Sequence, residues 1–332
     1  MTDSMILHVR YPAGRDRITL RCEPDWEHDL EPETTSPDRT RFDFRIGFDA
    51  PFRYFKVVLQ RDGRTHWSQG ENYLALQNGH TRMDVYPRFF DGGGCSACEL
   101  HRLTSPDGRR EHAVRVFYPA GYVENPLESY PVVYMQDGQN LFFPGEAFGG
   151  QDWMIGETLG VLDSMNLVQR AIVVGVYPQD RMVDYTQDGY ESYGRFLIDV
   201  VRPWVDAHYR TRSGPEHTAV IGSSLGGVVS LYLAWHWPEV FGYAGCLSST
   251  FGYRDDLARR VLREAKRPIK VYLDSGWPRD NYEVTRNMRN RLIERGFVEG
   301  RDLMYLAFPN ARHDERSWAM RAHIPLQHFF RV

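Results

Sequence analysis

Residues 217–227, HTAVIGSSLGG, constrain the fold of this chain more than any other segment. An apolar run leads into a G-x-S-x-G motif whose serine is Ser224, and a helical stretch that stops before Pro238 follows. A strand that turns tightly into a helix needs small residues on both sides of the serine. Only Ser224 has glycine both two residues before it and two residues after it, so the motif selects Ser224 and not Ser223.

The place of Ser224 between a strand and a helix suits a nucleophile. Backbone N–H groups at the start of a helix, with the positive end of the helix dipole, favour the negative charge that develops when a serine attacks a carbonyl group. We therefore predict that Ser224 is a catalytic nucleophile. The alternative is a tight strand–helix turn whose serine has no chemical role.

The chain around this motif alternates between apolar runs and helical stretches. Continuous apolar runs are typical of strands buried on both faces of a parallel sheet. The runs occupy residues 131–135, 171–176, 218–221 and 269–273, and helical stretches such as 194–209 and 281–295 separate them. The alternation predicts an α/β fold with a mostly parallel sheet flanked by helices. With the serine motif it predicts an α/β-hydrolase fold.

The first 90 residues have a different pattern. Short runs with alternating apolar and polar residues, such as 42–46 and 54–60, are separated by turn residues, which is typical of a small all-β sandwich. Three consecutive glycines at residues 92–94 interrupt regular structure. We therefore expect an immunoglobulin-like sandwich domain over residues 1–94 and a catalytic domain over residues 95–332.

A general base and an acid should follow the nucleophile in the order Ser, Asp or Glu, His. His313 lies in the loop after a predicted last strand at residues 303–308 and is the predicted base. The acid should follow the strand that ends near residue 273. We prefer Asp280, beyond a turn, and keep Asp274, at the strand end, as the alternative. Asp280 also suits a plain N-cap of the next helix.

An oxyanion hole requires two backbone N–H groups near the nucleophile. One should belong to Leu225, directly after Ser224, and the other to the loop after an early strand. Here that loop is residues 136–140, where Gly138 allows a sharp turn, and we assign the second N–H group to Gln139. The alternative is that Asp137 and Gly138 form only a turn.

Charge and hydropathy exclude several classes of partner. The formal net charge is -4, whereas nucleic-acid binding needs a strongly basic face. The N-terminus lacks the basic start and apolar stretch of a secretory signal, and no apolar run approaches the length of a membrane span. We expect a cytoplasmic protein without nucleic-acid or membrane partners. Its oligomeric state stays open, with a homodimer among the alternatives.

The cysteines indicate neither a disulfide framework nor a metal. There are four, Cys22, Cys95, Cys98 and Cys246, and Cys95 and Cys98 form a C-x-x-C pair with His101 nearby. A structural zinc site needs four N or S ligands, usually from two such pairs, and there is no second pair. We expect reduced thiols and no metal or organic cofactor, with zinc at Cys95 and Cys98 as the alternative.

Four segments, in order along the chain, carry a resemblance to a known family. They are residues 134–142 (YMQDGQNLF), residues 174–176 with Arg181 and Tyr185, the motif around Ser224, and His313 with Trp318. Through them the chain from about residue 99 onward resembles the putative-esterase family, which includes enterochelin esterases, feruloyl esterases and mycolyltransferases. The resemblance implies an α/β-hydrolase fold, acyl transfer to water or an alcohol, and the nucleophile and base roles for Ser224 and His313.

Two further features qualify the resemblance. Gln136 stands where the family often has histidine before Asp-Gly-Gln, and its side chain can neither titrate nor act as a base. The change alters the pocket without removing the backbone N–H groups. Through residues 54–59 (YFKVVL) and 67–73 (WSQGENY), the N-terminal segment resembles an immunoglobulin-like domain of the starch-binding kind. One interpretation is that Trp26, Trp67 and Tyr73 stack on sugar rings. We favour the other interpretation, that they pack inside the sandwich or against the catalytic domain.

The predicted function is therefore a serine esterase that hydrolyses a small-molecule carboxylic ester, an aryl or sugar ester among the candidates. The mechanism is a Ser-His-Asp triad with an acyl-enzyme intermediate. The candidate substrate-binding residues are Asp137, Trp153, Arg181, Tyr185, Trp277 and Trp318. The alternatives are an acyltransferase with the same triad and a non-catalytic glycan-binding protein on a hydrolase scaffold.

Overall fold

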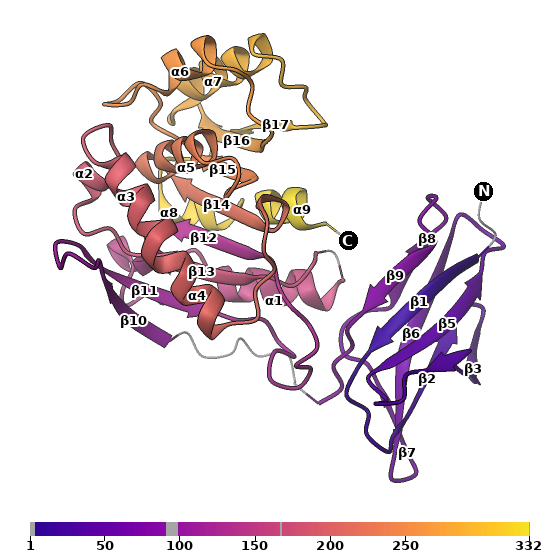
Figure 1. The fold of residues 1–332 in the computed structure, drawn as a ribbon. Coiled ribbons are helices and arrows are strands. Elements are labelled where there is room, and N and C mark those ends of the chain that lie inside the picture. Colours follow the sequence, from indigo (N-terminus) through magenta and orange to yellow (C-terminus); the bar gives the residue numbers. More distant parts are fainter. Residues whose placement is uncertain (1–3, 91–98, 167, 332) are drawn as a thin grey trace.

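The computed structural model describes residues 4–90, 99–166 and 168–331. Figure 1 shows an all-β part and a larger part in which helices flank a sheet. Each of the three sheets lies wholly on one side of residues 91–98. The domain boundary that we place at Gly94 lies outside the described residues, as do Cys95 and Cys98 of the alternative zinc site. Both therefore stay predictions.

Two sheets share one apolar core in the N-terminal part. One has the strand order β4-β5-β1-β9 and the other the order β3-β2-β6-β7, with β8 paired to β6. The strands are β1 (Ser4–Arg10), β2 (Arg17–Cys22), β3 (Asp25–Leu30), β4 (Thr34–Thr35), β5 (Arg41–Gly47), β6 (Phe52–Arg61), β7 (Arg64–Trp67), β8 (Tyr73–Leu76) and β9 (Arg82–Val85). Phe42, Phe44 and Ile46 alternate along β5 and are buried with Leu20 and Val57 of the other sheet, as in a β-sandwich.

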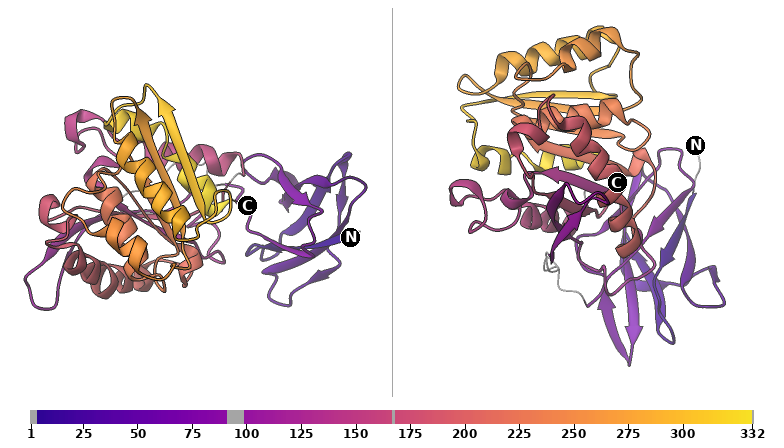
Figure 2. Two further views of the ribbon diagram at one scale, coloured as in Figure 1. Left: turned by 90° about the horizontal axis from the view of Figure 1, so that it is seen from above. Right: turned by 60° about the vertical axis from the view of Figure 1, so that its left-hand side comes forward.

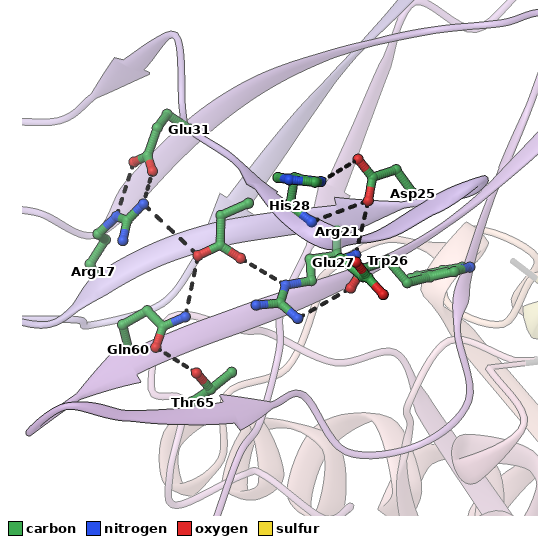
Figure 3. Close-up of polar contacts among 10 residues, drawn as sticks. Arg17, Arg21, Asp25, Trp26, Glu27, His28, Glu31, Gln60 and Thr65 are labelled. Atoms are coloured by element: carbon green, nitrogen blue, oxygen red, sulfur yellow. Dashed lines mark hydrogen bonds and ion pairs between the residues drawn. The ribbon is translucent and has the colours of Figure 1, made fainter.

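The aromatic residues of this part do not all enter its core. Figure 3 shows Arg21 beside Trp26, and Arg21 donates from Nη1 to the carbonyl oxygen of Trp26 at 3.1 Å. The Arg21 guanidinium also lies 4.9 Å from the ring centre of Trp67. Trp67 is 39% exposed, so the favoured interpretation, that it packs away from solvent, is wrong for this residue. Tyr73 does pack against the sandwich core.

The second part is built on an eight-stranded sheet with the order β10-β11-β13-β12-β14-β15-β16-β17. The strands are β10 (Glu99–Thr104), β11 (Glu111–Phe117), β12 (Val132–Gln136), β13 (Ile172–Val176), β14 (Thr218–Ser223), β15 (Tyr243–Leu247), β16 (Lys270–Trp277) and β17 (Leu303–Pro309). Strands from β13 across to β17 run parallel, whereas β11 is antiparallel to both neighbours. Strands β12 to β15 are buried throughout, which explains their apolar runs. The predicted fold class is confirmed.

Helices cover both faces of this sheet (Figure 2). They are α1 (Ile155–Ser164), α2 (Arg181–Asp184), α3 (Tyr190–Phe196), α4 (Arg202–His208), α5 (Leu225–His236), α6 (Leu257–Arg263), α7 (Tyr282–Glu294), α8 (Glu315–Ala319) and α9 (His323–Phe330). A π-helical turn (Leu197–Val201) joins α3 to α4, and 3-10 turns occupy Gly138–Asn140, Phe148–Gly150 and Pro215–His217. Helices α3 to α7 pack in one apolar core, and α1, α8 and α9 pack in the other.

The strand order creates a natural position for a site. In the chain β12 is followed by its neighbour β13, but β14 lies on the other side of β12. The connections that leave β12 and β14 therefore run in opposite directions, which defines a topological switch point between their carboxyl ends. Open α/β sheets bind ligands at such points, so a site is expected between the loops after β12 and β14.

The two parts of the chain meet through hydrogen bonds and buried ion pairs. The Asn125 side-chain amide donates to the carbonyl oxygens of Arg10 and Pro87 at 2.9 and 3.0 Å. Arg88 pairs with Asp163 at 3.0 Å. A cavity of about 1050 Å³ lies between β8 and β9 on one side and the chain around residues 163–170 on the other.

Candidate active site

Ser224 occupies the turn between β14 and α5, where the backbone is strained. Its φ of 55° and ψ of -122° lie in a region that residues with a side chain rarely adopt. Hydrogen bonds hold the turn: the Ser224 N–H donates to the carbonyl oxygen of Leu247 at 2.9 Å, and the Thr250 N–H donates to that of Ser224 at 3.3 Å. The serine is therefore fixed on the switch-point edge of the sheet.

Both glycines of the motif lie in close contacts, which exclude a side chain at position 222 and crowd one at position 226. A Cβ atom at Gly222 would lie 2.5 Å from the carbonyl carbon of Gly226, a distance that no side chain tolerates. At Gly226 a Cβ atom would lie 3.1 Å from Cβ of Gln136 and 3.3 Å from a carboxylate oxygen of Asp137. The start of α5 thus packs directly against the loop after β12.

His313 connects the serine to an acid. Its Nε2 atom lies 3.0 Å from Oγ of Ser224, and its Nδ1 atom lies 2.7 Å from Oδ1 of Asp280. The three side chains come from the ends of three parallel strands, β14, β16 and β17. The ring of Trp318 meets the His313 ring edge to face, with 5.0 Å between centres. The structure therefore brings the three predicted triad residues into one hydrogen-bonded line.

Asp280 is held from several sides. Its carboxylate accepts hydrogen bonds from the N–H groups of Gly276 and Asn281, both at 2.7 Å, and from the hydroxyl of Ser248. Burial opposes the charged form, but these bonds and the one from His313 keep the pKa of Asp280 below its ordinary value. The alternative of a plain N-cap does not apply, because Asn281 occupies that position without a side-chain cap.

The alternative acid, Asp274, lies elsewhere. It is fully buried within β16, where its carboxylate accepts hydrogen bonds from Nε of Arg321 at 3.1 Å and from the Tyr272 hydroxyl at 2.7 Å. Burial raises the pKa of Asp274 to about 6, although Arg321 opposes the shift. Of the two candidates, only Asp280 has a hydrogen bond to His313.

The predicted oxyanion-hole residues lie on the two loops at the switch point. Leu225 is the first residue of α5, so its N–H group has no acceptor within the helix. Asp137 adopts φ 55°, and the 3-10 turn Gly138–Asn140 follows it. Gln139 is near the start of that turn, where its N–H group also has no acceptor inside the turn. The role of Leu225 and Gln139 stays a prediction.

Asp137 and Tyr185 brace this loop. Arg181 donates two hydrogen bonds to the carboxylate of Asp137, at 2.9 and 3.1 Å, and the Asp137 N–H donates to the Tyr185 hydroxyl at 2.9 Å. Tyr193 donates to the side-chain oxygen of Gln136. Asp137 and Tyr185 are buried, while Arg181 is partly exposed. Of these three predicted substrate-binding residues, Arg181 is therefore the one within reach of solvent.

The predicted pocket tryptophans divide in the same way. Trp153 and Trp318 are buried, with 5.9 Å between their ring centres, because their rings fill the core beneath the His313 loop. Trp277 is 50% exposed. Trp153, Trp318, Asp137 and Tyr185 are therefore buried, whereas Arg181 and Trp277 reach solvent. The substrate-binding role of all six residues stays a prediction.

Ser248 and Arg321 were missed by sequence reasoning. Ser248 follows β15, so its place at the carboxyl end of a parallel strand was an available signal. Arg321 lies between α8 and α9, and no motif distinguishes it from the other arginines. Among the described residues, no group of His, Cys, Asp and Glu side chains could hold a metal ion. No helix in the described ranges is long and apolar enough to cross a bilayer.

Comparison with known proteins gives one family. The model of the family described as "Putative esterase" matches residues 105–321. The uncharacterized proteins YbbA and YjcH of Bacillus subtilis are 24% and 32% identical over 198 and 146 residues. These matches cover 51% and 42% of this chain and 74% and 57% of the relatives. An endo-1,4-beta-xylanase/feruloyl esterase of Xylanibacter ruminicola is 30% identical over 139 residues, 40% of this chain and 19% of that protein.

Solved structures with the same fold include two esterases. A ferulic acid esterase from Anaeromyces mucronatus superposes with a TM-score of 0.56 at 20% identity, over 72% of this chain and 92% of that one. The enterobactin esterase of Shigella flexneri superposes with a TM-score of 0.56 at 13% identity, over 99% of this chain and 94% of that one. The second likeness therefore includes the N-terminal sandwich.

Proposed function

Because the chain belongs to the putative-esterase family, we propose that it hydrolyses a carboxylic ester through the triad of Ser224, His313 and Asp280. The observation that carries the proposal is the line of hydrogen bonds from Oγ of Ser224 through His313 to Asp280. Asp280 is ionised and can only accept, so the proton of the shared bond resides on Nδ1 of His313. Nε2 is then free to accept the serine proton.

In the first step Ser224 is acylated. Oγ attacks the ester carbonyl carbon while Nε2 of His313 takes its proton, and the carbonyl π pair moves onto the oxygen. The N–H groups of Leu225 and Gln139 stabilise that oxyanion. When the intermediate collapses, the bond to the alcohol oxygen breaks and His313 returns the proton to this leaving group.

In the second step water releases the acyl group. His313 removes a proton from water, and the resulting hydroxide attacks the acyl carbon and forms a second tetrahedral oxyanion. The bond to Ser224 breaks, Oγ takes the proton from His313, and the free acid leaves. Asp280 stabilises the imidazolium in both steps without being protonated itself.

The loops around the triad favour an apolar or aryl acyl group. The ends of parallel strands and the segments that follow them gather at the carboxyl edge of the sheet, and several of these segments carry large apolar side chains that stay exposed. These are Phe143, Phe148, Met154, Met182, Tyr253, Trp277 and Met320. A ferulic acid esterase and an enterobactin esterase share the fold. An ester of an aromatic acid is therefore the substrate class that we propose.

Hydrolysis of p-nitrophenyl acetate and butyrate tests the proposal. The wild type should release p-nitrophenol, and Ser224→Ala should reduce kcat by at least about a thousandfold. Methyl ferulate, compared with methyl esters of aliphatic acids, then tests the preference for an aryl acyl group. An inactive wild type, or a Ser224→Ala variant as active as the wild type, would contradict the proposed function.

A further inference from the structure

We propose that Asp274, Arg321 and Ser248 form a support network that positions the triad acid Asp280; this inference rests on the proposed function. The network is a continuous line of hydrogen bonds on the side of Asp280 away from the nucleophile. Within the described part of the chain, the hydrogen bonds of these three side chains lead to one another, to Tyr272 and to Asp280, but not to Ser224 or His313. They are therefore positioning residues rather than catalytic ones.

The geometry runs from the core to the triad. Nε of Arg321 donates to Oδ2 of Asp274 at 3.1 Å, and Nη2 of Arg321 donates to Oγ of Ser248 at 2.9 Å. The Ser248 hydroxyl then bonds to Oδ2 of Asp280. The Ser248 N–H also donates to the backbone and side-chain oxygens of Asp274, at 2.8 and 3.3 Å. The Ser248 carbonyl oxygen also accepts from the Asn281 side-chain amide at 2.8 Å, so hydrogen bonds to four residues hold Ser248 in place.

The direction of each bond follows from the donors available. Arginine has only donors, so Oγ of Ser248 must accept from Arg321. The single hydroxyl proton of Ser248 is then free for the carboxylate of Asp280, which can only accept. A positive donor on one side polarises the hydroxyl and strengthens the bond that it makes on the other. The network thus delivers an oriented donor to Asp280.

Burial makes this arrangement effective. Arg321 is 3% exposed, and Asp274, Ser248 and the Asp280 side chain have no exposed surface. Asp274 neutralises the buried guanidinium, which would otherwise be an uncompensated charge. The groups that face Asp274 are Arg321, the Tyr272 hydroxyl and, more distantly, the Cys246 thiol. The charge pair beneath the triad is therefore balanced, and only a neutral hydroxyl passes its influence to Asp280.

The network also ties together segments that carry the triad. Ser248 follows β15, Asp274 belongs to β16 just before the Asp280 turn, and Arg321 follows the His313 loop by one short helix. Four donors, from His313, Ser248, Gly276 and Asn281, surround the Asp280 carboxylate. With Ser248 removed, the carboxylate keeps three donors, becomes more basic, and is less firmly oriented toward His313.

The first test compares Ser248→Ala with Ser249→Ala. Both serines are fully buried and adjacent, but Oγ of Ser249 has no hydrogen-bond partner among the residues that the structure describes. Its removal is therefore the matched control. We expect Ser248→Ala to lower kcat about tenfold, the size of a lost hydrogen bond to a charged group. The acid limb of the kcat/KM profile should move to higher pH, because a more basic Asp280 stabilises the protonated His313.

Ser249→Ala should change neither kcat nor the acid limb. If Ser248 had only a structural role, Ser248→Ala would lower the thermal stability but would not move the acid limb of the kcat/KM profile. If Ser248→Ala keeps the wild-type kcat and the wild-type acid limb, the proposal is wrong.

The second test removes the buried charges together. Asp274→Asn with Arg321→Gln eliminates both charges at once and leaves no unpaired ion. In that double variant, adding Ser248→Ala should lower kcat by a much smaller factor than it does in the wild type, because the Ser248 hydroxyl is no longer polarised or fixed by Arg321. Equal losses in the two backgrounds would overturn the network, even with the triad intact.

A measurement that needs no turnover separates this proposal from the proposed function. The low-field proton resonance of Nδ1 of His313 reports its bond to Asp280 directly. Ser248→Ala should shift or broaden this resonance, and Ser249→Ala should leave it unchanged. An unshifted resonance contradicts the network whether or not the protein hydrolyses esters, whereas an inactive wild type contradicts the proposed function alone.

Discussion

Two buried arginine–carboxylate clusters in this molecule have the same chemistry but differ in the other groups that each arginine contacts. Beneath the triad, Arg321 pairs with Asp274. Where the N-terminal sandwich meets the rest of the chain, Arg170 pairs with Glu128. In both clusters burial raises the pKa of the carboxyl group while the arginine opposes the shift. The same chemistry therefore exists in both places.

The difference lies in what the remaining donors of each arginine contact. Arg321 donates to Ser248 and through it to Asp280, which contacts the base. Arg170 donates to the main-chain carbonyl oxygens of Tyr86 and Ala120, and its Nε lies 3.8 Å from a carboxylate oxygen of Asp163. These contacts all lie at the interface and do not reach the triad. A buried ion pair thus serves stability or chemistry according to the acceptor at its far end.

The largest expected effect is at the triad itself. Asp280→Asn keeps the shape of the acid but cannot stabilise the His313 imidazolium, so kcat should fall about ten-thousandfold. The free energy of unfolding should change far less than this factor implies. Ester hydrolysis and urea unfolding of the same preparation check both statements. If kcat decreases by less than about tenfold, Asp280 is not the catalytic acid.

The interface cluster should respond in the opposite way. Arg170→Met leaves Glu128 buried without its partner and should lower the free energy of unfolding by about 3–5 kcal/mol. The kcat of the folded protein should stay within about twofold of the wild type, because none of the contacts of Arg170 with described residues leads to the triad. The double variant Glu128→Gln with Arg170→Met should recover part of the stability. A fall in kcat comparable to that of Asp280→Asn would erase the distinction between the clusters.

A glycine at the site should separate activity from stability. In Gly226→Ala the new methyl group presses on Gln136 and Asp137 and displaces the predicted oxyanion loop, so kcat should fall about a hundredfold. Alanine also favours the helix, which offsets the strain. Gly160→Ala in α1, where a Cβ atom meets nothing within 4 Å, is the matched control and should leave kcat unchanged. Equal kcat values for both variants would argue against an oxyanion role for that loop.

The smallest effect concerns pH. The pKa of Asp274 is about 6 when folded, above the value of about 3.9 for an unfolded chain. The folded state therefore binds the extra proton between these values, and stability relative to Asp274→Asn should decrease as the pH rises from about 4 to about 6. The decrease is at most about 3 kcal/mol. Urea unfolding of the wild type and of Asp274→Asn at pH 4 and pH 7 measures this decrease. If the difference in their free energies of unfolding is the same at both pH values, the pKa of Asp274 is not raised.

The candidates for the nucleophile and the base could be selected from the sequence because their signals are local. Ser224 carries its glycines with it, and His313 follows the last predicted strand. The fold class was equally accessible, since strands buried on both faces must be apolar throughout. Asp274 and Asp280 both come after the strand predicted at residues 269–273, although β16 in fact extends to Trp277. The sequence could therefore rank the two aspartates but could not decide between them.

What the sequence alone determined is the fold class, the approximate places of several buried strands, and the serine and histidine candidates. Local pattern and chain order are sufficient for these because each depends on residues close together in the chain. Only the tertiary structure decided which acid meets His313, that Trp153 and Tyr185 are buried, and that Arg321 reaches Asp274 and Ser248. Those facts depend on the direction of side chains from distant segments, and no sequence spacing encodes that direction.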